Sequence, residues 1–267
     1  MRAARALALV GVLGIAVYAL YAAAMVALHP RYIYPFGQDR FDNPRFVQRA
    51  VDDVPVYVFD GGADAPVIVY FMGNLGALGG FAPMLDHHAD KGRSVVAMGY
   101  RGGGGLPGQS SETSLKADAR RVIAGLGDVL PNRRGPVIVQ GYSLGTGLAL
   151  HVAAHSNRVD GVILAAPYAQ LCDLMTTAGH VPACYLPGVQ KWQTLKDVPQ
   201  VRSPVLILHG DRDDLVPHAQ GLELAEALQA AGKSVDFVTV AGAGHVDLFG
   251  RPDYMQPLDA FIEAARE

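Results

Sequence analysis

The stretch that decides the fold spans residues 137–145 and reads Val-Ile-Val-Gln-Gly-Tyr-Ser-Leu-Gly. Its first three residues predict a short buried strand, and residues 144–155 have the pattern of a helix. Between them stands G-x-S-x-G, a motif that marks the strained strand-to-helix turn carrying a nucleophilic serine. The sequence therefore predicts a nucleophile elbow at Ser143. A glycine-rich turn with a capping serine is the alternative.

Short apolar runs alternate with helical patterns along most of the chain. The strand candidates are residues 54–59, 67–71, 95–98, 137–139, 162–164, 205–208 and 235–240. The helix candidates are residues 115–130, 144–155, 219–231 and 254–266. Most strand candidates are continuous Val, Ile or Leu runs, which are typical of strands buried on both faces of a parallel sheet. We therefore expect an α/β fold with a mostly parallel, doubly wound sheet.

One long interruption, residues 168–202, separates two of the strand candidates. It is too long for a simple connection and predicts a small cap over the mouth of the sheet. Residues 29–44, rich in proline, aromatic and charged side chains, predict a linker. The expected organisation is therefore an N-terminal apolar segment, this linker, and one domain over residues 45–267 with the cap inserted.

The apolar segment, residues 6–28, contains no charged side chain. As a helix it would span about 34 Å, enough to cross the hydrocarbon core of a membrane. We expect a single-pass transmembrane anchor, and a signal peptide cut near the small residues 22–24 is the alternative. Arginines flank the segment on both sides, but Arg2 and Arg5 before it favour an extracytoplasmic position for the domain.

Composition limits the classes of partner and cofactor. The formal net charge is −3 and the longest basic run is Arg133-Arg134, so no nucleic-acid partner is expected. Cys172 and Cys184 are either a disulfide or two buried thiols, and they lack the neighbours of a zinc site. Residues 103–108 match G-x-G-x-x-G only formally, since they contain a proline and do not lead directly into a helix. We expect no metal and no cofactor.

A nucleophilic serine needs a histidine to take its proton and a carboxylate to orient that histidine. In this type of sheet the chain order is Ser, then Asp or Glu, then His. After Ser143, one strand candidate leads into three carboxylates within residues 211–214, and the last strand candidate leads to His245. The sequence therefore predicts Ser143 as nucleophile and His245 as base. Packing or surface positions are expected for the histidines on helical patterns: His87, His88, His151 and His155.

Acyl transfer also needs two backbone N–H donors aimed at the developing oxyanion. The first is expected from Leu144, the residue after the nucleophile. The second is expected after the strand candidate 67–71, where residues 72–76 form a glycine-rich turn. A tight turn without this role is the alternative.

These motifs together resemble the α/β-hydrolase superfamily and, more narrowly, its membrane-anchored branch of Bem46-like or ABHD13/ABHD17-type serine hydrolases. The resemblance runs from about residue 34 to the C-terminus. Its carriers are residues 71–74 (FMGN), 100–102 (YRG), 141–145 (GYSLG), 204–213 (PVLILHGDRD) and 244–245 (GH). The resemblance implies that Asp213 is the acid of the triad and that Asn74 donates the second oxyanion N–H.

The chain departs from the family at two places. Met72 stands where the family usually has histidine, so the support of the oxyanion turn is in question. The run Gly102–Gly105 stands where the family more often has an aromatic residue, and it predicts a more mobile loop.

The expected function is a membrane-anchored serine hydrolase that cleaves a carboxylic ester or thioester through an acyl-enzyme intermediate. Its substrate would be a small-molecule, lipid-derived or acylated compound. The apolar cap is consistent with a lipophilic acyl group and equally with plain packing against the core. A non-catalytic α/β-hydrolase-like binding protein at the membrane is one alternative, and a serine peptidase on the same fold is another. The sequence does not predict an oligomeric state.

Overall fold

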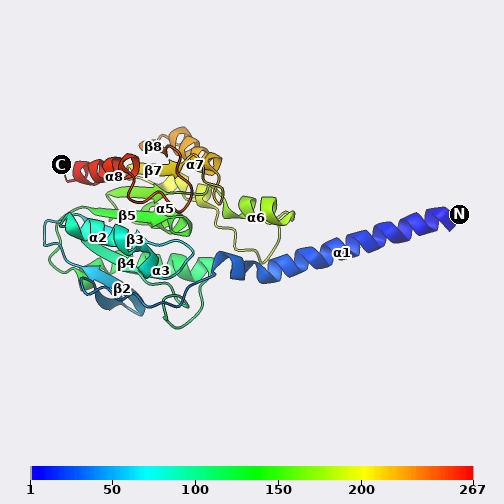
Figure 1. Cartoon of the computed structure of the whole chain (residues 1–267), viewed down its shortest axis with the longest axis horizontal. Helices are drawn as coiled ribbons and strands as arrows, with labels where there is room; N and C mark the ends of the chain where they lie inside the picture. The colour runs from blue at the N-terminus through cyan, green and yellow to red at the C-terminus, as the bar shows by residue number, and fades with distance from the viewer. Residues whose placement is uncertain (1, 267) are drawn as a thin grey trace.

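The computed structural model describes residues 2–266 of the chain. A central sheet is covered by helices, and one long helix extends away from it at the N-terminus (Figure 1). The strands are β1 (Val47–Val51), β2 (Val54–Phe59), β3 (Val67–Phe71), β4 (Ser94–Met98), β5 (Val137–Tyr142), β6 (Gly161–Ala165), β7 (Val205–Gly210) and β8 (Val235–Val240). The α-helices are α1 (Arg2–Ile33), α2 (Ala82–Asp90), α3 (Glu112–Ala124), α4 (Leu126–Val129), α5 (Leu144–His155), α6 (Leu171–Gly179), α7 (His218–Ala230) and α8 (Pro252–Ala264). The short 3-10 helices are η1 (Leu78–Phe81), η2 (Thr194–Lys196) and η3 (Val198–Gln200). Glu267, the last residue of the expected domain, lies outside the described residues.

The sheet has eight strands in the order β1-β2-β4-β3-β5-β6-β7-β8. β1 pairs antiparallel with β2, and β2 with β4, whereas all the other neighbours run parallel. Every residue of β3 to β7 is buried, as their Val, Ile and Leu runs indicate. The predicted α/β fold with a mostly parallel sheet is confirmed.

The register of the parallel strands determines which loops meet. Phe71 at the end of β3 pairs with Gly141 of β5, and Tyr142 of β5 pairs with Ala165 of β6. Parallel strands end at the same edge of a sheet, so the turn after β3 and the elbow after β5 lie side by side. The loops after β7 and β8 reach this edge as well.

The sequence predicts no strand at β1 and no separate helix at α2 or α6. β1 is exposed at four of its five positions, so it lacks the apolar run of a central strand.

The helix expected over residues 115–130 divides into α3 and α4 at Gly125. A Cβ there would lie 2.3 Å from Cγ1 of Val51, so the glycine lets Val51 of β1 pack closely against this helix.

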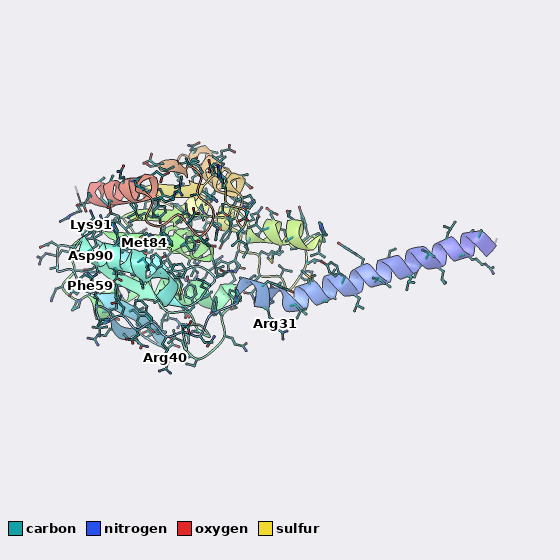
Figure 2. The ribbon with its side chains drawn as sticks, viewed as in Figure 1. Arg31, Arg40, Phe59, Met84, Asp90 and Lys91 are labelled. Carbon is teal, nitrogen blue, oxygen red and sulfur yellow. A yellow bond between two sulfur atoms is a disulfide. The ribbon has the colours of Figure 1, made fainter. Side chains whose placement is uncertain are left out.

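The helix α1 covers the expected anchor, residues 6–28, and continues to Ile33. The first five residues of the expected linker 29–44 are therefore helical rather than extended. The stretch Ala3–Ile33 is long and apolar enough to cross a membrane, which makes it a candidate span. Residues 3–21 are all exposed, and α1 meets the body of the protein close to Arg31 (Figure 2).

The segment expected as a cap, residues 168–202, holds α6, η2 and η3, and α6 lies between the sheet and α1 (Figure 1). A disulfide joins Cys172, in the first turn of α6, to Cys184 in the loop that follows this helix. Of the two alternatives for the cysteines, the structure therefore contains the bridge. It ties the loop after α6 to the start of α6.

Candidate active site

The predicted elbow forms the turn between β5 and α5. Ser143 has φ 50° and ψ −117°, a backbone conformation that is strained for any residue other than glycine. A Cβ on Gly145 would lie 2.1 Å from the carbonyl oxygen of Phe71, and one on Gly141 would lie 2.4 Å from the carbonyl oxygen of Gly145. Both glycines are therefore required by close backbone contact. The Ser143 hydroxyl makes no helix-cap hydrogen bond, which argues against the capping-serine alternative.

The three predicted catalytic side chains meet above this turn. Nε2 of His245 lies 2.9 Å from Oγ of Ser143, and Nδ1 of His245 lies 2.7 Å from Oδ2 of Asp213. All three residues are 6–7% exposed. When Nδ1 donates its proton to the carboxylate, Nε2 is left with a lone pair that can accept the serine proton. The arrangement can therefore perform nucleophilic acyl transfer.

Asp213 is the aspartate of residues 211–214 that reaches the histidine. Its Oδ1 accepts the backbone N–H of Leu215 at 3.0 Å and of Val216 at 2.7 Å, which leaves Oδ2 directed at His245. Burial alone would raise the pKa of Asp213, but the hydrogen bonds from His209, His245 and Val216 outweigh burial and hold this pKa well below its ordinary value. The carboxylate is therefore ionised at neutral pH. Asp211 and Asp214 are exposed.

A fourth side chain, His209, reaches the triad and has no assigned role in the sequence prediction. Its Nε2 lies 2.9 Å from the carbonyl oxygen of Val216 and 3.3 Å from Oδ2 of Asp213. Its ring is fully buried against α7, where a Cβ on Gly221 would lie 2.3 Å from Nδ1. An Nε2–H group in this place supports both the carboxylate and the turn that holds it. The only signal in the sequence is its position at the end of the strand that precedes Asp213.

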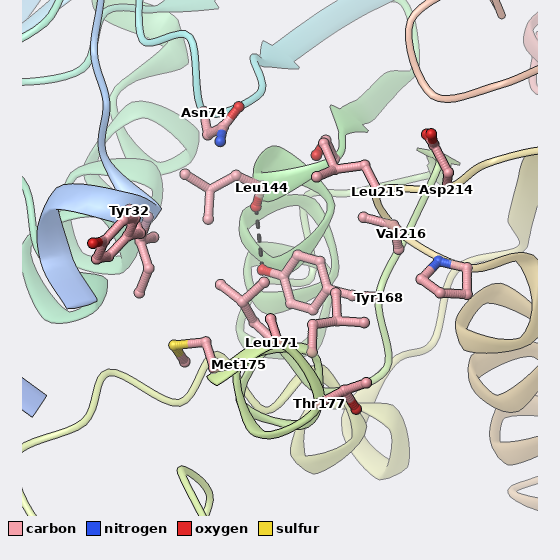
Figure 3. Close-up of a pocket in the computed structure, with 15 residues that line it drawn as sticks. Tyr32, Asn74, Leu144, Tyr168, Leu171, Met175, Thr177, Asp214, Leu215 and Val216 are labelled. Carbon is pink, nitrogen blue, oxygen red and sulfur yellow. Dashed lines mark hydrogen bonds between the residues drawn. The ribbon is translucent and has the colours of Figure 1, made fainter. Parts of the chain in front are cut away.

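Asn74 and Leu144 lie together at one end of the cavity beside Ser143 (Figure 3). Within residues 2–266, neither backbone N–H donates a hydrogen bond to another protein group. Two unpaired donors beside a nucleophile are what an oxyanion requires. Their placement is consistent with the predicted oxyanion hole.

The two departures from the family both concern the turn after β3. The carbonyl oxygen of Met72 accepts the hydroxyl of the buried Tyr100 at 2.7 Å, so a tyrosine supports the turn before Asn74. The run Gly102–Gly105 packs on this same turn, where a Cβ on Gly103 would lie 2.2 Å from the carbonyl oxygen of Gly76. Glycine is therefore needed at position 103 for close packing on this turn.

A cavity of about 390 Å³ opens beside Ser143, and we refer to it as the catalytic pocket (Figure 3). Its walls are mainly apolar. They include Tyr32 and Ile33 of α1, Leu171, Leu174 and Met175 of α6, and Leu215 and Val216 after β7. The end of the candidate membrane span therefore forms part of the wall of the catalytic pocket, which the sequence did not predict.

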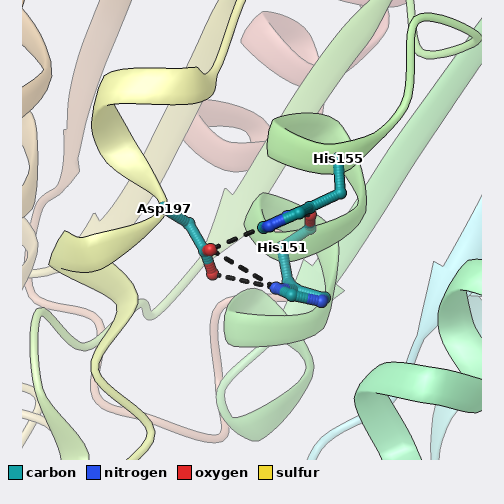
Figure 4. Close-up of side chains that lie close together, drawn as sticks. All are labelled: His151, His155 and Asp197. Carbon is teal, nitrogen blue, oxygen red and sulfur yellow. Dashed lines mark hydrogen bonds and ion pairs between the residues drawn. The ribbon is translucent and has the colours of Figure 1, made fainter.

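A cluster of His151, His155 and Asp197 has the spacing of metal ligands but is better explained as a packing network (Figure 4). Nδ1 of His151 lies 3.1 Å from Oδ2 of Asp197, and Nε2 of His151 accepts the guanidinium N–H of Arg120 at 2.6 Å. Both ring nitrogens of His151 are thus engaged, and the arginine would repel a cation. Burial lowers the pKa of His151, in keeping with a neutral ring.

His88 and His87 also have partners, in a network between α2 and α8. His88 is fully buried, with Nε2 2.7 Å from Oε1 of Gln140 and Nδ1 3.3 Å from Nη1 of Arg93. Arg93 in turn donates to Asp259 at 2.7 Å, and His87 contacts the same carboxylate at 2.9 Å. These histidines are packing residues, as expected.

Comparison with known proteins places this geometry in a family. The Dienelactone hydrolase family matches residues 106–254, more than half of the chain. An uncharacterized protein of Mycobacterium tuberculosis is 32% identical over 70% of this chain and 65% of its own length. The lysophosphatidylserine lipase ABHD12 of Xenopus tropicalis is 28% identical over 71% of this chain and 54% of its own length. The chain thus spans less than two thirds of the length of these relatives.

Among solved structures, the Pyrococcus furiosus esterase Pf2001 has the same fold. It superposes with a TM-score of 0.70 at 17% identity, over 88% of this chain and 99% of the esterase. The fold and the relatives both indicate an α/β hydrolase, so the resemblance to the α/β-hydrolase superfamily is confirmed. The chain belongs to the Dienelactone hydrolase family within the α/β-hydrolase superfamily.

Proposed function

We propose that this α/β hydrolase is a membrane-anchored serine hydrolase that cleaves carboxylic ester or thioester bonds. The observation that carries the proposal is the continuous chain of hydrogen bonds from Ser143 through His245 to Asp213, at 2.9 Å and 2.7 Å. Asp213 is the carboxylate of this triad, because among Asp211, Asp213 and Asp214 it is the one whose side chain reaches His245.

In the proposed reaction, Nε2 of His245 takes the hydroxyl proton as Oγ of Ser143 attacks the acyl carbonyl carbon. Asp213 holds the imidazole in the required tautomer and stabilises the imidazolium that forms. The oxyanion accepts the N–H groups of Asn74 and Leu144. His245 then protonates the leaving alcohol or thiol, and water releases the acyl group from Ser143 by the same steps with His245 as base.

The catalytic pocket supports a lipid-derived or otherwise lipophilic acyl substrate. Its walls are mainly apolar side chains, and an acyl chain placed there removes apolar surface from water. The lipase relative named above acts on a lysophospholipid, and this likeness favours the same broad class here. A peptide substrate has less support, because few polar side chains line the pocket beside Ser143.

The anchored position and its orientation are supported by two observations. The stretch Ala3–Ile33 of α1 is long and apolar enough to span a bilayer. The Cys172–Cys184 disulfide is typical of an oxidising compartment, which favours the extracytoplasmic side for the body of the protein. A maleimide assay on intact cells with and without reductant tests this orientation.

Hydrolysis assays separate the proposed enzyme from a non-catalytic binding protein. The purified full chain in detergent should hydrolyse p-nitrophenyl esters, and Ser143→Ala should reduce kcat/KM to background. Asp211→Asn is the matched control, because Asp211 is an exposed carboxylate in the same turn, and this variant should retain activity. Wild-type protein without esterase or thioesterase activity on any chain length would overturn the proposal.

A further inference from the structure

A second cavity of about 340 Å³ lies between α1 and the cap, and we refer to it as the anchor groove. Its lining comes from Met25 and Val26 of α1 and from Val181, Leu186 and Val189 of the loop after α6. The anchor groove and the catalytic pocket share three lining residues, Tyr32, Met175 and Ala178. The two cavities therefore meet at a common wall formed by the end of α1 and α6.

The anchor groove is lined almost entirely by apolar side chains. Two lining residues, Tyr32 and His29, have polar side-chain atoms. Nδ1 of His29 lies 2.6 Å from the carbonyl oxygen of Val26, and its Nε2 accepts the backbone N–H of Gln190 at 3.0 Å. Both nitrogens of this ring are thus engaged within the protein. The groove offers a ligand hydrophobic contact rather than hydrogen bonds or charge.

The helix α1 is fixed against the body, so the groove is preformed. Directly after α1, the hydroxyl of Tyr34 donates to Oε1 of Gln190 at 2.5 Å and accepts Nε1–H of the buried Trp192 at 3.1 Å. Glu112, at the start of α3, accepts the backbone N–H of Trp192 at 3.0 Å. These contacts join the end of the anchor, the cap and α3 in one network.

The outer end of the groove lies at the level where a membrane surface is expected. The exposed and uncharged part of α1, residues 6–21, is about 24 Å long and so covers most of a hydrocarbon core of about 30 Å. Tyr18 and Tyr21 close this part, and their hydroxyls donate to the carbonyl oxygens of His180 and Gly179 at the tip of the cap. Tyrosines of this kind prefer the membrane–water interface. Met25, the first groove residue, follows one turn later.

We propose that the anchor groove is a lateral access path for the acyl chain of a membrane amphiphile. The chain leaves the leaflet beside Tyr21, lies between α1 and the cap, and passes the shared wall at Ala178 to bring its ester or thioester to Ser143. The transmembrane anchor is thus part of the substrate-binding site as well as an attachment. This inference rests on the proposed hydrolase function for its last step only.

Photocrosslinking tests the path without depending on turnover. The full-length Ser143→Ala protein is reconstituted in phosphatidylcholine vesicles that contain a palmitoyl lysophospholipid with a diazirine on the acyl chain. After irradiation, adducts are expected in peptides that contain Met25–Tyr32 and residues 175–189. Leu186→Trp, which fills the groove, should lower the yield of these adducts at least fivefold.

Two further variants keep the result interpretable. Val189→Trp fills the groove from another position and should have the same effect, so that one misfolded variant does not decide the outcome. Ala27→Phe places a large side chain on the exposed face of α1 and should leave the adducts unchanged. Adducts that persist in both filled variants, or that fall only on the exposed face of α1, would overturn the proposal.

Kinetics on the active protein separate this inference from the proposed function. In the Leu186→Trp and Val189→Trp proteins, the ratio of kcat/KM for C16 to C4 esters should fall at least tenfold, and in Ala27→Phe it should not change. If the wild type hydrolyses esters but this ratio is the same in all variants, the access path is wrong and the hydrolase stands. If crosslinks behave as expected but no ester is cleaved, the groove stands and the hydrolase is wrong.

Discussion

Replacing Asp213 with asparagine should abolish most of the activity while leaving the fold intact. In the wild type, Oδ1 accepts the N–H groups of Leu215 and Val216, and Oδ2 accepts Nδ1–H of His245. The amide oxygen of asparagine must keep the place of Oδ1, because both backbone donors point at it. The amide NH₂ then faces Nδ1 of His245.

A donor in that place selects the wrong histidine tautomer. Nδ1 must accept, so the proton moves to Nε2, which lies 2.9 Å from Oγ of Ser143 and can then no longer take the serine proton. Loss of the base in this way costs about 10⁴-fold in kcat, or about 5.4 kcal/mol of transition-state stabilisation. His209 would lose its acceptor at Oδ2 as well, which adds to the loss rather than offsetting it.

The assay is hydrolysis of a short p-nitrophenyl ester by the full chain in detergent, with thermal unfolding measured on the same samples. Asp211→Asn is the matched control, since this exposed carboxylate only accepts the N–H of Gly242, and it should stay within about threefold of wild type. An Asp213→Asn protein that is folded and loses less than tenfold in kcat would show that Asp213 does not set the tautomer of His245. A large loss in Asp211→Asn would refute the choice of acid.

Three other perturbations have defined outcomes. Gly145→Ala should lower kcat at least 100-fold and reduce the free energy of unfolding by about 1–3 kcal/mol, because the new Cβ would lie 2.1 Å from the Phe71 carbonyl oxygen and displace the oxyanion turn. Ester hydrolysis measures the first effect and urea unfolding the second. A wild-type rate would contradict the prediction. Burial and the nearby Arg93 lower the pKa of His88 from 6.5 to about 3. The unfolded state therefore binds the extra proton as the pH falls below about 6.5, and this histidine should contribute a loss of about 2 kcal/mol in unfolding free energy between pH 7 and pH 5. Urea titrations at both pH values should show that the unfolding free energy falls by about 2 kcal/mol more in the wild type than in His88→Gln. An equal change in unfolding free energy between pH 7 and pH 5 in the two proteins would count against it. The double variant Cys172→Ser, Cys184→Ser should have a lower Tm than the wild type, because the disulfide restricts the unfolded chain. Treatment of the wild type with reductant should lower Tm as well. An unchanged melting curve in both experiments would contradict a stabilising role of the bridge.

Much of the fold follows from local patterns in the sequence. The five central strands are continuous apolar runs, and each was predicted because burial on both faces demands such runs. The elbow was predicted because Gly141 and Gly145 flank Ser143 between a strand and a helix. The edge strand β1 was missed, because an exposed strand is selected by its pairing with β2 and carries no apolar pattern of its own.

The remaining parts of the site depend on tertiary contacts that no local pattern reports. Tyr100 reaches the carbonyl oxygen of Met72 from the end of another strand, a contact set by the order of the strands in the sheet. His209 lies beside Asp213 only because the turn after β7 folds back on its own strand. The contribution of Tyr32 to the catalytic pocket requires α1 to continue beyond the expected anchor and to pack on the cap.

The central claim is that Ser143 is a nucleophile activated by His245, and covalent labelling tests it most directly. The full chain is treated with a fluorophosphonate, and the adduct is located by intact-mass and peptide mass spectrometry. We expect one adduct on Ser143, no adduct in Ser143→Ala, and labelling slowed at least 100-fold in His245→Gln. A folded wild-type protein that is not labelled, or equal labelling of Ser143→Ala, would show that Ser143 is not an activated nucleophile.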